Sequence, residues 1–394
     1  MHLEVSGLGK PSQHLVLRKA ERGGASEISI QFGRQPHDYP GQQGESPFLL
    51  GGEVVIHASH FSITCCGKCF IVNLLSVESK FTPTINSAQT IGDIMRAARF
   101  YSYGSPEVLI VDEAPEPHAI EGSVRIKVEA SSVNPIDYLL RGGGFQDVMP
   151  LNLPAIPGRD AAGVVDEVGA GVTDTAVGDR VFGLGGVSDT TAEYAVLTAW
   201  SVIPEGWSMA QAAAAGLAAA TAEAALEVLG DLKGKALFVE GPSGAVGGAA
   251  AAIALSAGAT VIGSGREASH DYLRSLGVVP VSYGPGLIDR VAQIAPDGVD
   301  AALHAAPSAS LPDLVTIAGS PGRVVTVIDD EGAARYGLHK VNARNESALL
   351  RHAAALGREG SYTPRVDHIL PVSDIAEAHR IAESGGGKVV VTQP

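Results

Sequence analysis

A glycine-rich turn, Gly241-Pro242-Ser243-Gly244-Ala245-Val246-Gly247, is the segment of this sequence best suited to hold a ligand. An apolar run at residues 236–240 precedes it and an alanine-rich run to Ala257 follows, which predicts a strand, a tight turn and a helix. Glycines there let backbone amides approach phosphate groups at the positive N-terminus of the helix. The pattern therefore predicts a dinucleotide pyrophosphate in this turn, with a ligand-free strand-to-helix turn as the alternative.

The end of the next predicted strand, residues 260–263, indicates which dinucleotide binds. Enzymes that use NAD usually place an acidic residue here, which accepts hydrogen bonds from the ribose hydroxyls. This chain instead has Ser264-Gly265-Arg266, a hydroxyl and a guanidinium that suit a 2′-phosphate. The sequence therefore favours NADP(H) over NAD, unless Arg266 is an ordinary solvated charge.

The elements that must position these residues alternate between helix and strand after the glycine turn. The predicted helices are residues 269–276, 287–294 and 311–318, and the predicted strands are residues 278–283, 299–303 and 323–328. Such alternation is typical of an α/β fold with a doubly wound parallel sheet, in which ligands bind at the carboxyl ends of the strands.

Composition and charge limit the kinds of partner. A chain of 394 residues with 45% hydrophobic and 18% charged residues can form two or three globular domains. The net charge of −15 repels phosphate backbones and anionic lipid headgroups. We therefore expect a small-molecule substrate, and neither nucleic acid nor a membrane as partner.

Composition also divides the chain near Met95. Residues 1–94 contain 4 alanines and residues 95–394 contain 52. Strand-like runs occur in the first part at residues 27–32 and 53–63, and no long helical pattern does. Residues 1–94 are therefore interpreted as an extension that the remainder does not need, and a chain that starts at Met95 is expected to fold and stay active.

The extension contains the residue types that bind zinc. They are His57, His60, Cys65, Cys66 and Cys69. The paired C-x2-C units of a zinc ribbon are missing, so a metal site and an incidental cysteine cluster both remain interpretations. So few cysteines, without a secretory signal pattern, favour a cytoplasmic protein.

A series of motifs in a specific order surrounds the glycine turn. They are Ser132-Val133-Asn134-Pro135-Ile136-Asp137, Arg141-Gly142-Gly143, Ile156-Pro157-Gly158-Arg159-Asp160-Ala161-Ala162-Gly163-Val164-Val165, Gly178-Asp179-Arg180-Val181, Ala220-Thr221-Ala222 and Gly387-Lys388-Val389-Val390-Val391. The series resembles the zinc-free quinone oxidoreductase branch of the medium-chain dehydrogenase/reductase superfamily. The resemblance runs from Met95 to the C-terminus and leaves residues 1–94 outside it.

The resemblance also shows which residues are missing. The zinc alcohol dehydrogenases of this superfamily have a cysteine at the position of Asn134, and a histidine and a glutamate at Arg159-Asp160. Without those ligands, no metal would polarise a substrate carbonyl. A quinone or enone delocalises the charge that develops during hydride transfer through its own conjugation, whereas a simple ketone needs a metal or strong donors. The resemblance therefore implies NADPH-dependent reduction of a quinone or an α,β-unsaturated carbonyl.

Transferred residue by residue, the resemblance implies a cofactor site. Asn134 and Thr221 would flank the nicotinamide end of NADP(H). The residues implied around the two phosphate groups are Ser243, Gly244, Ala245, Val246 and Gly247 for the pyrophosphate, and Ser264, Arg266 and Tyr283 for the 2′-phosphate. Structural alternatives exist, because Asn134 could cap a turn, Thr221 could bond its own helix, and Tyr283 could belong to the core.

The implied catalytic residues are Asn134, Asp137 and Tyr138. Asp137 and Arg141 match motif positions near the substrate entrance, and loops at residues 142–150 and 183–191 would shape the pocket. Relatives often have tyrosines at the positions of Leu139 and Phe145 in this chain. If the segment were extended, strand alternation would point Tyr138 the other way, so Tyr138 and Phe145 suit pocket walls better than proton donors. Water is then a possible proton source.

We expect a Rossmann domain at residues 216–354 and a β-rich, barrel-like substrate domain from residues 95–215 and 355–394, with the cleft between them. By analogy with relatives, the strand at residues 323–328 would pair across a two-fold axis in a homodimer. Two other functions remain open. The chain could bind NADPH without turnover, as a sensor or interaction module, or could be a tailoring or enoyl-reducing component of a larger pathway.

Overall fold

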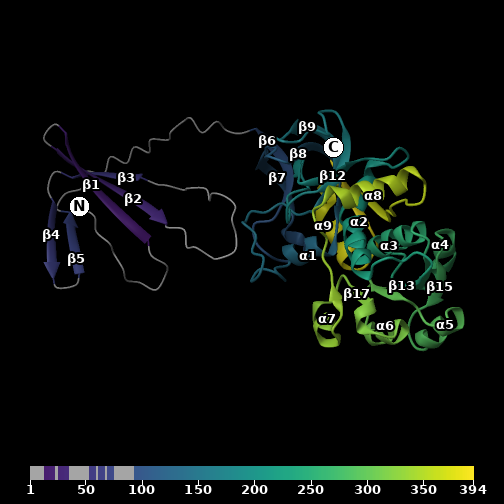
Figure 1. Ribbon diagram of the computed structural model, residues 1–394. Coiled ribbons are helices and arrows are strands. Elements are labelled where there is room, and N and C mark those ends of the chain that lie inside the picture. Colours follow the sequence, from purple (N-terminus) through teal and green to yellow (C-terminus); the bar gives the residue numbers. More distant parts are fainter. Residues whose placement is uncertain (1–12, 23–24, 35–52, 59–60, 67–68, 75–92) are drawn as a thin grey trace. The chain divides into compact units, whose positions relative to one another are not determined.

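The computed structural model describes residues 13–22, 25–34, 53–58, 61–66, 69–74 and 93–394 (Figure 1). The chain divides into two compact units, Met1–Gln89 and Thr90–Pro394. Each unit is described here by itself.

The described part of the first unit consists of strands. They are β1 (Gln13–Arg22), β2 (Ala25–Arg34), β3 (Glu53–Ala58), β4 (Phe61–Cys66) and β5 (Cys69–Leu74). The first three form an antiparallel sheet, and the last two pair with each other. The strand predicted at residues 53–63 is divided between β3 and β4. The side chains of the histidine and cysteine cluster lie outside the described residues, so the metal site stays a prediction.

The larger sheet of the second unit has seven strands from two distant segments of the chain. Its order is β12-β10-β9-β8-β20-β19, and β11 pairs with β8. The strands are β8 (Val124–Val133), β9 (Asp160–Val168), β10 (Arg180–Leu184), β11 (Tyr194–Leu197), β12 (Ala199–Val202), β19 (His368–Pro371) and β20 (Val389–Thr392). A hairpin and two helices complete this part, namely β6 (Ile94–Arg99), β7 (Ile110–Pro115), α1 (Pro135–Arg141) and α9 (Ile375–Glu383). Because Val389 pairs with Val133, the C-terminal strand lies beside Asn134.

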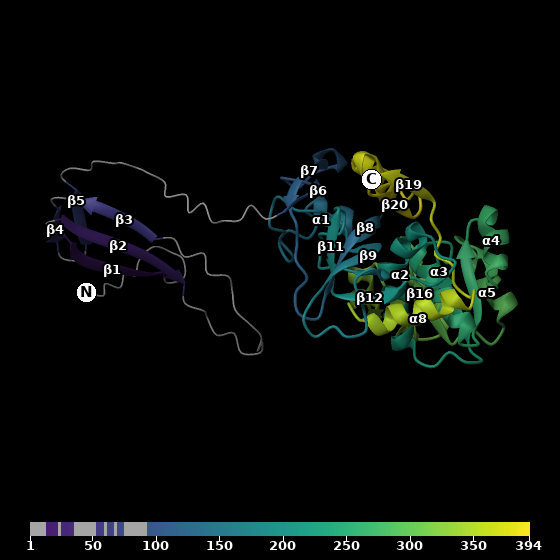
Figure 2. The ribbon, with the colours of Figure 1, turned by 90° about the horizontal axis from the view of Figure 1, so that it is seen from above.

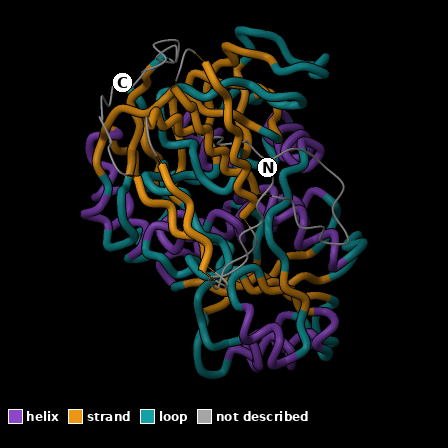
Figure 3. Tube along the Cα trace, turned by 90° about the vertical axis from the view of Figure 1, so that its left-hand side faces the viewer, coloured by secondary structure: helices purple, strands orange, loops and turns teal. Residues whose placement is uncertain are grey.

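The second sheet of this unit is parallel and has the order β15-β14-β13-β16-β17-β18. Its strands are β13 (Ala236–Glu240), β14 (Thr260–Gly265), β15 (Val279–Ser282), β16 (Ala301–His304), β17 (Val324–Thr326) and β18 (His339–Lys340). The helices are α2 (Met209–Leu229), α3 (Ala245–Ser256), α4 (His270–Ser275), α5 (Leu287–Ile294), α6 (Leu311–Ala318), α7 (Asp330–Tyr336) and α8 (Ser347–Arg358). Figures 2 and 3 show this helix-rich part beside the strand-rich part.

Alternate residues of the parallel strands face different helices. Leu237 and Val239 pack with α2, α3 and α8, whereas Phe238 and Ile262 pack with α5 and α6. Helices on both faces of a parallel sheet confirm the predicted α/β, doubly wound architecture. The strand order reverses between β13 and β16, and the crevice at such a point is where these sheets bind ligands.

Helix α2 joins the two sheets of this unit. It begins with a capping box in which the Ser208 hydroxyl accepts from the Gln211 backbone N–H and the Gln211 side chain accepts from the Ser208 N–H. It packs on β8, β9 and β10 and also on α3. The helix is long and apolar enough to cross a membrane, but 72% of its most apolar window is buried in the protein. Its alanines therefore serve close packing between the sheets.

One sequence prediction about assembly is wrong. Residues 323–328 do contain a strand, β17, but β18 pairs with it through Val325 and His339 on the side away from β16. Both edges of β17 are therefore occupied within the chain, and this strand cannot pair across a two-fold axis.

Removal of residues 1–89 is expected to leave the second unit folded, with its thermal midpoint within about 2 °C of the full chain. The boundary at Met95 is less suitable, because β6 starts at Ile94 and the Asp93 carbonyl accepts from the Glu116 N–H at 2.8 Å. Circular dichroism melting of chains that start at residue 90 and at residue 95 tests this. An insoluble chain from residue 90 would contradict it.

Candidate active site

The glycine turn connects β13 to α3 with close backbone contacts. Gly241 has φ +80°, which favours glycine, and a Cβ on Gly247 would lie 2.2 Å from the Gly241 carbonyl oxygen. The N-cap of α3 is Gly244, which has no side chain to satisfy the first N–H groups of the helix. The structure thus places Ser243, Gly244, Ala245, Val246 and Gly247 together at a helix N-terminus, a geometry that fits a phosphate group.

The neighbouring strands end with the residues predicted to surround a 2′-phosphate. Gly265 pairs with Ser282, so Arg266 and Tyr283 follow at the same end of adjacent strands. Both side chains are exposed, Tyr283 to 58%, and the alternative that places Tyr283 in the core is wrong. Ser264 is buried, and its hydroxyl has no hydrogen-bond partner among the described residues. An orphaned hydroxyl beside an exposed arginine and tyrosine fits a phosphate ligand.

Asn134 and Asp137 lie at the start of α1, which is a helix where the sequence left an extended segment possible. Asn134 is its N-cap, and the Asn134 N–H donates to Asp137 Oδ2 at 2.8 Å. Asn134 is 4% exposed and Asp137 is 2% exposed. The argument from strand alternation that pointed Tyr138 away is therefore wrong, because Tyr138 follows Asn134 by one helical turn.

The side chain of Asn134 is fully engaged by other parts of the protein. Its Nδ2 donates to Asp160 Oδ1 at 2.9 Å, and its Oδ1 accepts from Lys388 Nζ at 2.7 Å. Asp160 also accepts from the Ser132 hydroxyl at 2.6 Å and from the Leu217 N–H at 2.8 Å. This buried network holds β8, β9, α1, α2 and the start of β20 together around one amide.

The residues at the zinc-ligand positions of the related alcohol dehydrogenases therefore have other partners. The amide nitrogen of Asn134 is a donor, which a metal cannot use. Arg159 donates to the Gly186 carbonyl at 3.2 Å and to Asn345 Oδ1 at 3.1 Å. Among the residues whose side chains are described, no group of three His, Cys, Asp or Glu could hold a metal ion. This donor set does not fit zinc.

Burial changes the acidity of the network. Burial, together with the neighbouring Asp160, raises the pKa of Asp137 to about 7. Burial also lowers the pKa of the Lys388 ammonium, while Asp160 and Asp137 oppose this. Asp137 Oδ1 has no hydrogen-bond partner among the described residues. Asp137 is therefore a carboxyl group that can hold or release a proton near neutral pH.

Tyr138 is half-buried on α1. Burial raises the pKa of its phenol, and Glu383 and Asp137 raise it further. The phenol therefore stays protonated at neutral pH and can donate a hydrogen bond.

Two other predicted residues have structural partners. Thr221 is buried within α2, and its hydroxyl donates to the Leu217 carbonyl at 2.7 Å, the helix bond considered as an alternative. Arg141 is 1% exposed and donates to the Gly104 carbonyl and Glu383, with His379 Nδ1 at 3.3 Å from Nη1. The Arg141 guanidinium joins α1 to α9 inside the protein, and the position of Arg141 near the substrate entrance stays a prediction.

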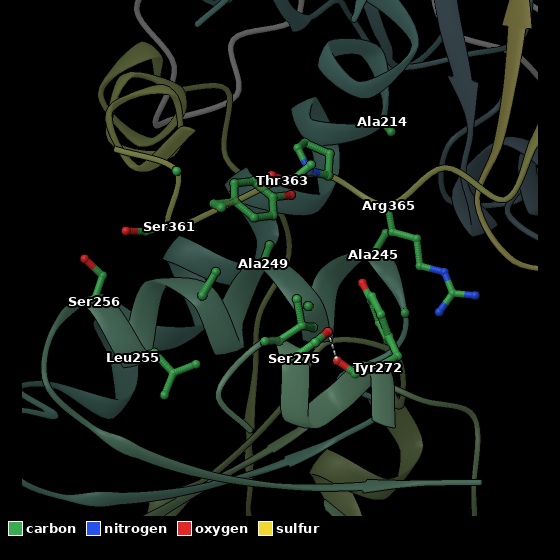
Figure 4. Close-up of a pocket in the computed structure, with 17 residues that line it drawn as sticks. Ala214, Ala245, Ala249, Leu255, Ser256, Tyr272, Ser275, Ser361, Thr363 and Arg365 are labelled. Atoms are coloured by element: carbon green, nitrogen blue, oxygen red, sulfur yellow. Dashed lines mark hydrogen bonds between the residues drawn. The ribbon is translucent and has the colours of Figure 1, made fainter. Parts of the chain in front are cut away.

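A cavity of about 530 Å³ extends along α3 from Gly244 to Ser256 (Figure 4). α3, α4 and residues 360–365 surround it, and the Arg365 guanidinium lies 4.9 Å from the centre of the Tyr272 ring. A second cavity of about 300 Å³ is lined by residues of β6 and β7, by residues 150–152 and 154–156, and by residues 187–189. Pro150 and residues 187–189 belong to the loops predicted to shape the substrate pocket. Tyr272 and Arg365, which line the first cavity, were not identified from the sequence because neither lies in a recognisable motif.

Comparison with known proteins agrees with this geometry. Residues 120–213 match the alcohol dehydrogenase GroES-like domain, and residues 280–391 match the zinc-binding dehydrogenase family. Human quinone oxidoreductase is 31% identical over 317 residues, which cover 75% of this chain and 95% of that protein. The structure of the quinone oxidoreductase from Coxiella burnetii has 26% identity and a TM-score of 0.65, and covers 76% of this chain and 99% of that one.

A shorter match is 40% identical to the pikromycin polyketide synthase component PikAII of Streptomyces venezuelae, over 42% of this chain and 4% of that protein. The quinone oxidoreductase relatives at about 30% identity identify the chain as an oxidoreductase. The chain belongs to the quinone oxidoreductase branch of the medium-chain dehydrogenase/reductase superfamily. The resemblance on which the sequence analysis relied is thus confirmed.

Proposed function

We propose that the chain reduces a quinone or an α,β-unsaturated carbonyl with NADPH and without zinc. The observation that carries this proposal is the Asn134 side chain, which donates to Asp160 and accepts from Lys388. An acceptor at this site receives no help from a metal, so it has to delocalise the negative charge itself. When bound, NADPH supplies the hydride.

The chain's own residues would perform the remaining tasks. The glycine turn would bind the pyrophosphate through backbone N–H groups, and Ser264, Arg266 and Tyr283 would bind the 2′-phosphate. The network around Asn134 would keep one wall of the site rigid. Asp137 holds a proton near neutral pH and Tyr138 offers a phenol, so either residue can supply the proton that the reduced product takes up.

A screen of quinones, enones and saturated ketones, followed by NADPH absorbance, tests the activity. We expect turnover of conjugated acceptors, no turnover of saturated ketones, and no change after a chelator is added. Zinc-dependent oxidation of a simple alcohol would refute the proposal.

Replacement of Arg266 by alanine is expected to weaken NADPH binding about 10–100-fold and to change NADH binding little. A charge-assisted contact to phosphate contributes about 1.5–3 kcal/mol, and NADH lacks the 2′-phosphate. Fluorescence titration with both cofactors measures this, with Arg335→Ala on the exposed side of α7 as the control. Equal affinity of the unmodified chain for both cofactors would show that Arg266 does not choose between them.

A second candidate function is an enoyl-reducing step in a larger biosynthetic pathway. The 40% identity to a segment of a polyketide synthase component supports it. Enoyl thioesters in the same screen distinguish the two, because this function predicts turnover of thioesters in preference to quinones.

A further inference from the structure

A row of buried polar residues crosses the carboxyl end of the parallel sheet. Glu240 on β13 pairs in register with Ser264 on β14 and His304 on β16, and His304 pairs with Thr326 on β17. They lie on the sheet face whose earlier residues, such as Phe238 and Ile262, form an apolar core with α5 and α6. A buried row of this kind is costly unless each member finds a partner.

Glu240 finds its partners in the loop after β16. It is 4% exposed, and its Oε1 accepts from the Ser308 hydroxyl at 2.9 Å, while its Oε2 accepts from the Ser310 hydroxyl at 2.5 Å. His304 Nε2 lies 3.4 Å from the same Oε2. Both carboxylate oxygens therefore contact the end of β16 or the loop that follows it, within residues 304–310.

His304 completes the arrangement as a neutral donor. Burial lowers its pKa, against the opposing effects of Glu240 and Asp329. Its Nδ1 lies 2.9 Å from the Thr326 hydroxyl, which already accepts from the N–H groups of Ile328 and Asp329. The Thr326 hydroxyl therefore donates to Nδ1, which leaves the proton of the neutral ring on Nε2, 3.4 Å from the Ser308 hydroxyl oxygen and 3.4 Å from Glu240 Oε2.

The hydroxyl of Ser310 does not cap the helix that Ser310 begins. Ser310 is the N-cap of α6, where a serine side chain normally accepts from the first turn, but this hydroxyl makes no such bond and donates to Glu240 instead. Ser308 is linked as well, because its oxygen accepts from the Ser310 N–H at 3.2 Å.

The loop that Glu240 holds touches the glycine turn. A Cβ on Gly241 would lie 2.7 Å from the Ala306 Cβ, and the Ala305 N–H donates to the Glu240 carbonyl at 3.2 Å. This contact lies between β13 and β16, where the strand order reverses. In such sheets, the strands on each side of the reversal point bind one mononucleotide of the dinucleotide. β14 and the predicted 2′-phosphate site lie on one side, and the loop after β16 lies on the other.

We propose that Glu240 is a positioning residue for the nicotinamide half of the cofactor, because it fixes the loop 305–310 against the glycine turn through Ser308 and Ser310. This inference rests on the proposed NADPH dependence. Glu240 itself touches neither cofactor nor substrate in this proposal, and acts through the loop.

The test compares NADPH with 2′,5′-ADP, which carries the 2′-phosphate but no nicotinamide. We expect Glu240→Gln and Ser310→Ala to lower the affinity for NADPH about tenfold, which is the effect of losing one hydrogen bond to a charged group. The affinity for 2′,5′-ADP should stay within about twofold of that of the unmodified chain. Ser310→Thr keeps the hydroxyl and should restore NADPH binding. Ser320→Ala, beyond the other end of α6, is the control.

The steady-state parameters give a second readout, in which the KM for NADPH rises while kcat at saturating NADPH falls less than about threefold. Equal NADPH affinity in all variants would overturn the inference. Equal losses of affinity for NADPH and for 2′,5′-ADP would also overturn the inference, because they indicate a general structural effect. If Glu240→Gln does not fold, the comparison of Ser310→Ala with Ser310→Thr decides. An unmodified chain that binds neither NADPH nor NADH would instead refute the proposed function.

Discussion

Replacement of Lys388 by methionine is expected to lower the free energy of unfolding by about 3–5 kcal/mol, because it removes one partner of a buried charge network. Lys388 is 7% exposed, and its ammonium lies among Asn134, Asp137 and Asp160. Methionine fills a similar volume without the charge. The carbonyl of Asn134 would lose its donor, and the pair formed by Asp137 and Asp160 would lose its buried counter-charge.

Urea unfolding at pH 7 measures this effect. Lys340→Met provides the control, because Lys340 is also partly buried beside an aspartate but lies at the edge of the parallel sheet. The double variant Lys388→Met/Asp137→Asn should recover part of the loss, since it removes one carboxylate together with the ammonium. A loss below about 1 kcal/mol for Lys388→Met would show that water reaches this network.

Replacement of Asp137 by asparagine is expected to remove a pH dependence of stability of about 4 kcal/mol. The pKa of Asp137 rises from 3.8 to about 7 on folding. Between these values the folded chain keeps a proton that the unfolded chain has released, so stability falls as pH rises. This loss of folding stability is absent below about pH 4 and complete above about pH 7. A shift of about three pKa units corresponds to this energy at 1.36 kcal/mol each.

Unfolding free energies of both proteins at pH 4.5, 6 and 8 give the difference curve. We expect the asparagine variant to gain stability relative to the unmodified chain across this range, because its side chain stays neutral and still accepts from the Asn134 N–H. Asp313→Asn in the first turn of α6 is the control and should follow the unmodified curve. Parallel curves for Asp137→Asn would mean that Asp137 is ionised in the folded protein at every pH tested.

Local patterns predicted the parallel sheet well. The elements α5 and α6 have the predicted bounds, and the glycine turn lies between β13 and α3 as expected. These segments have strong periodicity and turn residues, which act over a few positions. The motif series identified the family for the same reason, because each motif is short and keeps its order.

Long-range features were not accessible from local patterns. Lys388 and Asn134 are 254 positions apart, and only the pairing of β20 with β8 brings them together. Lys388 directly precedes three valines that are buried, and this pattern could have indicated from the sequence that the lysine is buried too. Glu240 gave no signal, because a charged residue at the end of a strand usually faces solvent. The strand β18 has two residues, too few for any period to show.

The short strand β18 also affects how the molecule behaves at high concentration. A sheet edge with a long row of free N–H and C=O groups can add a foreign strand, which is a route to aggregation. Here one edge is two residues long and includes Lys340, and the other edge, β15, contains Pro280, which has no N–H to donate. Neither edge of the parallel sheet therefore offers a long row of free N–H and C=O groups. We expect no edge-to-edge pairing of this sheet between molecules during refolding or in concentrated solution.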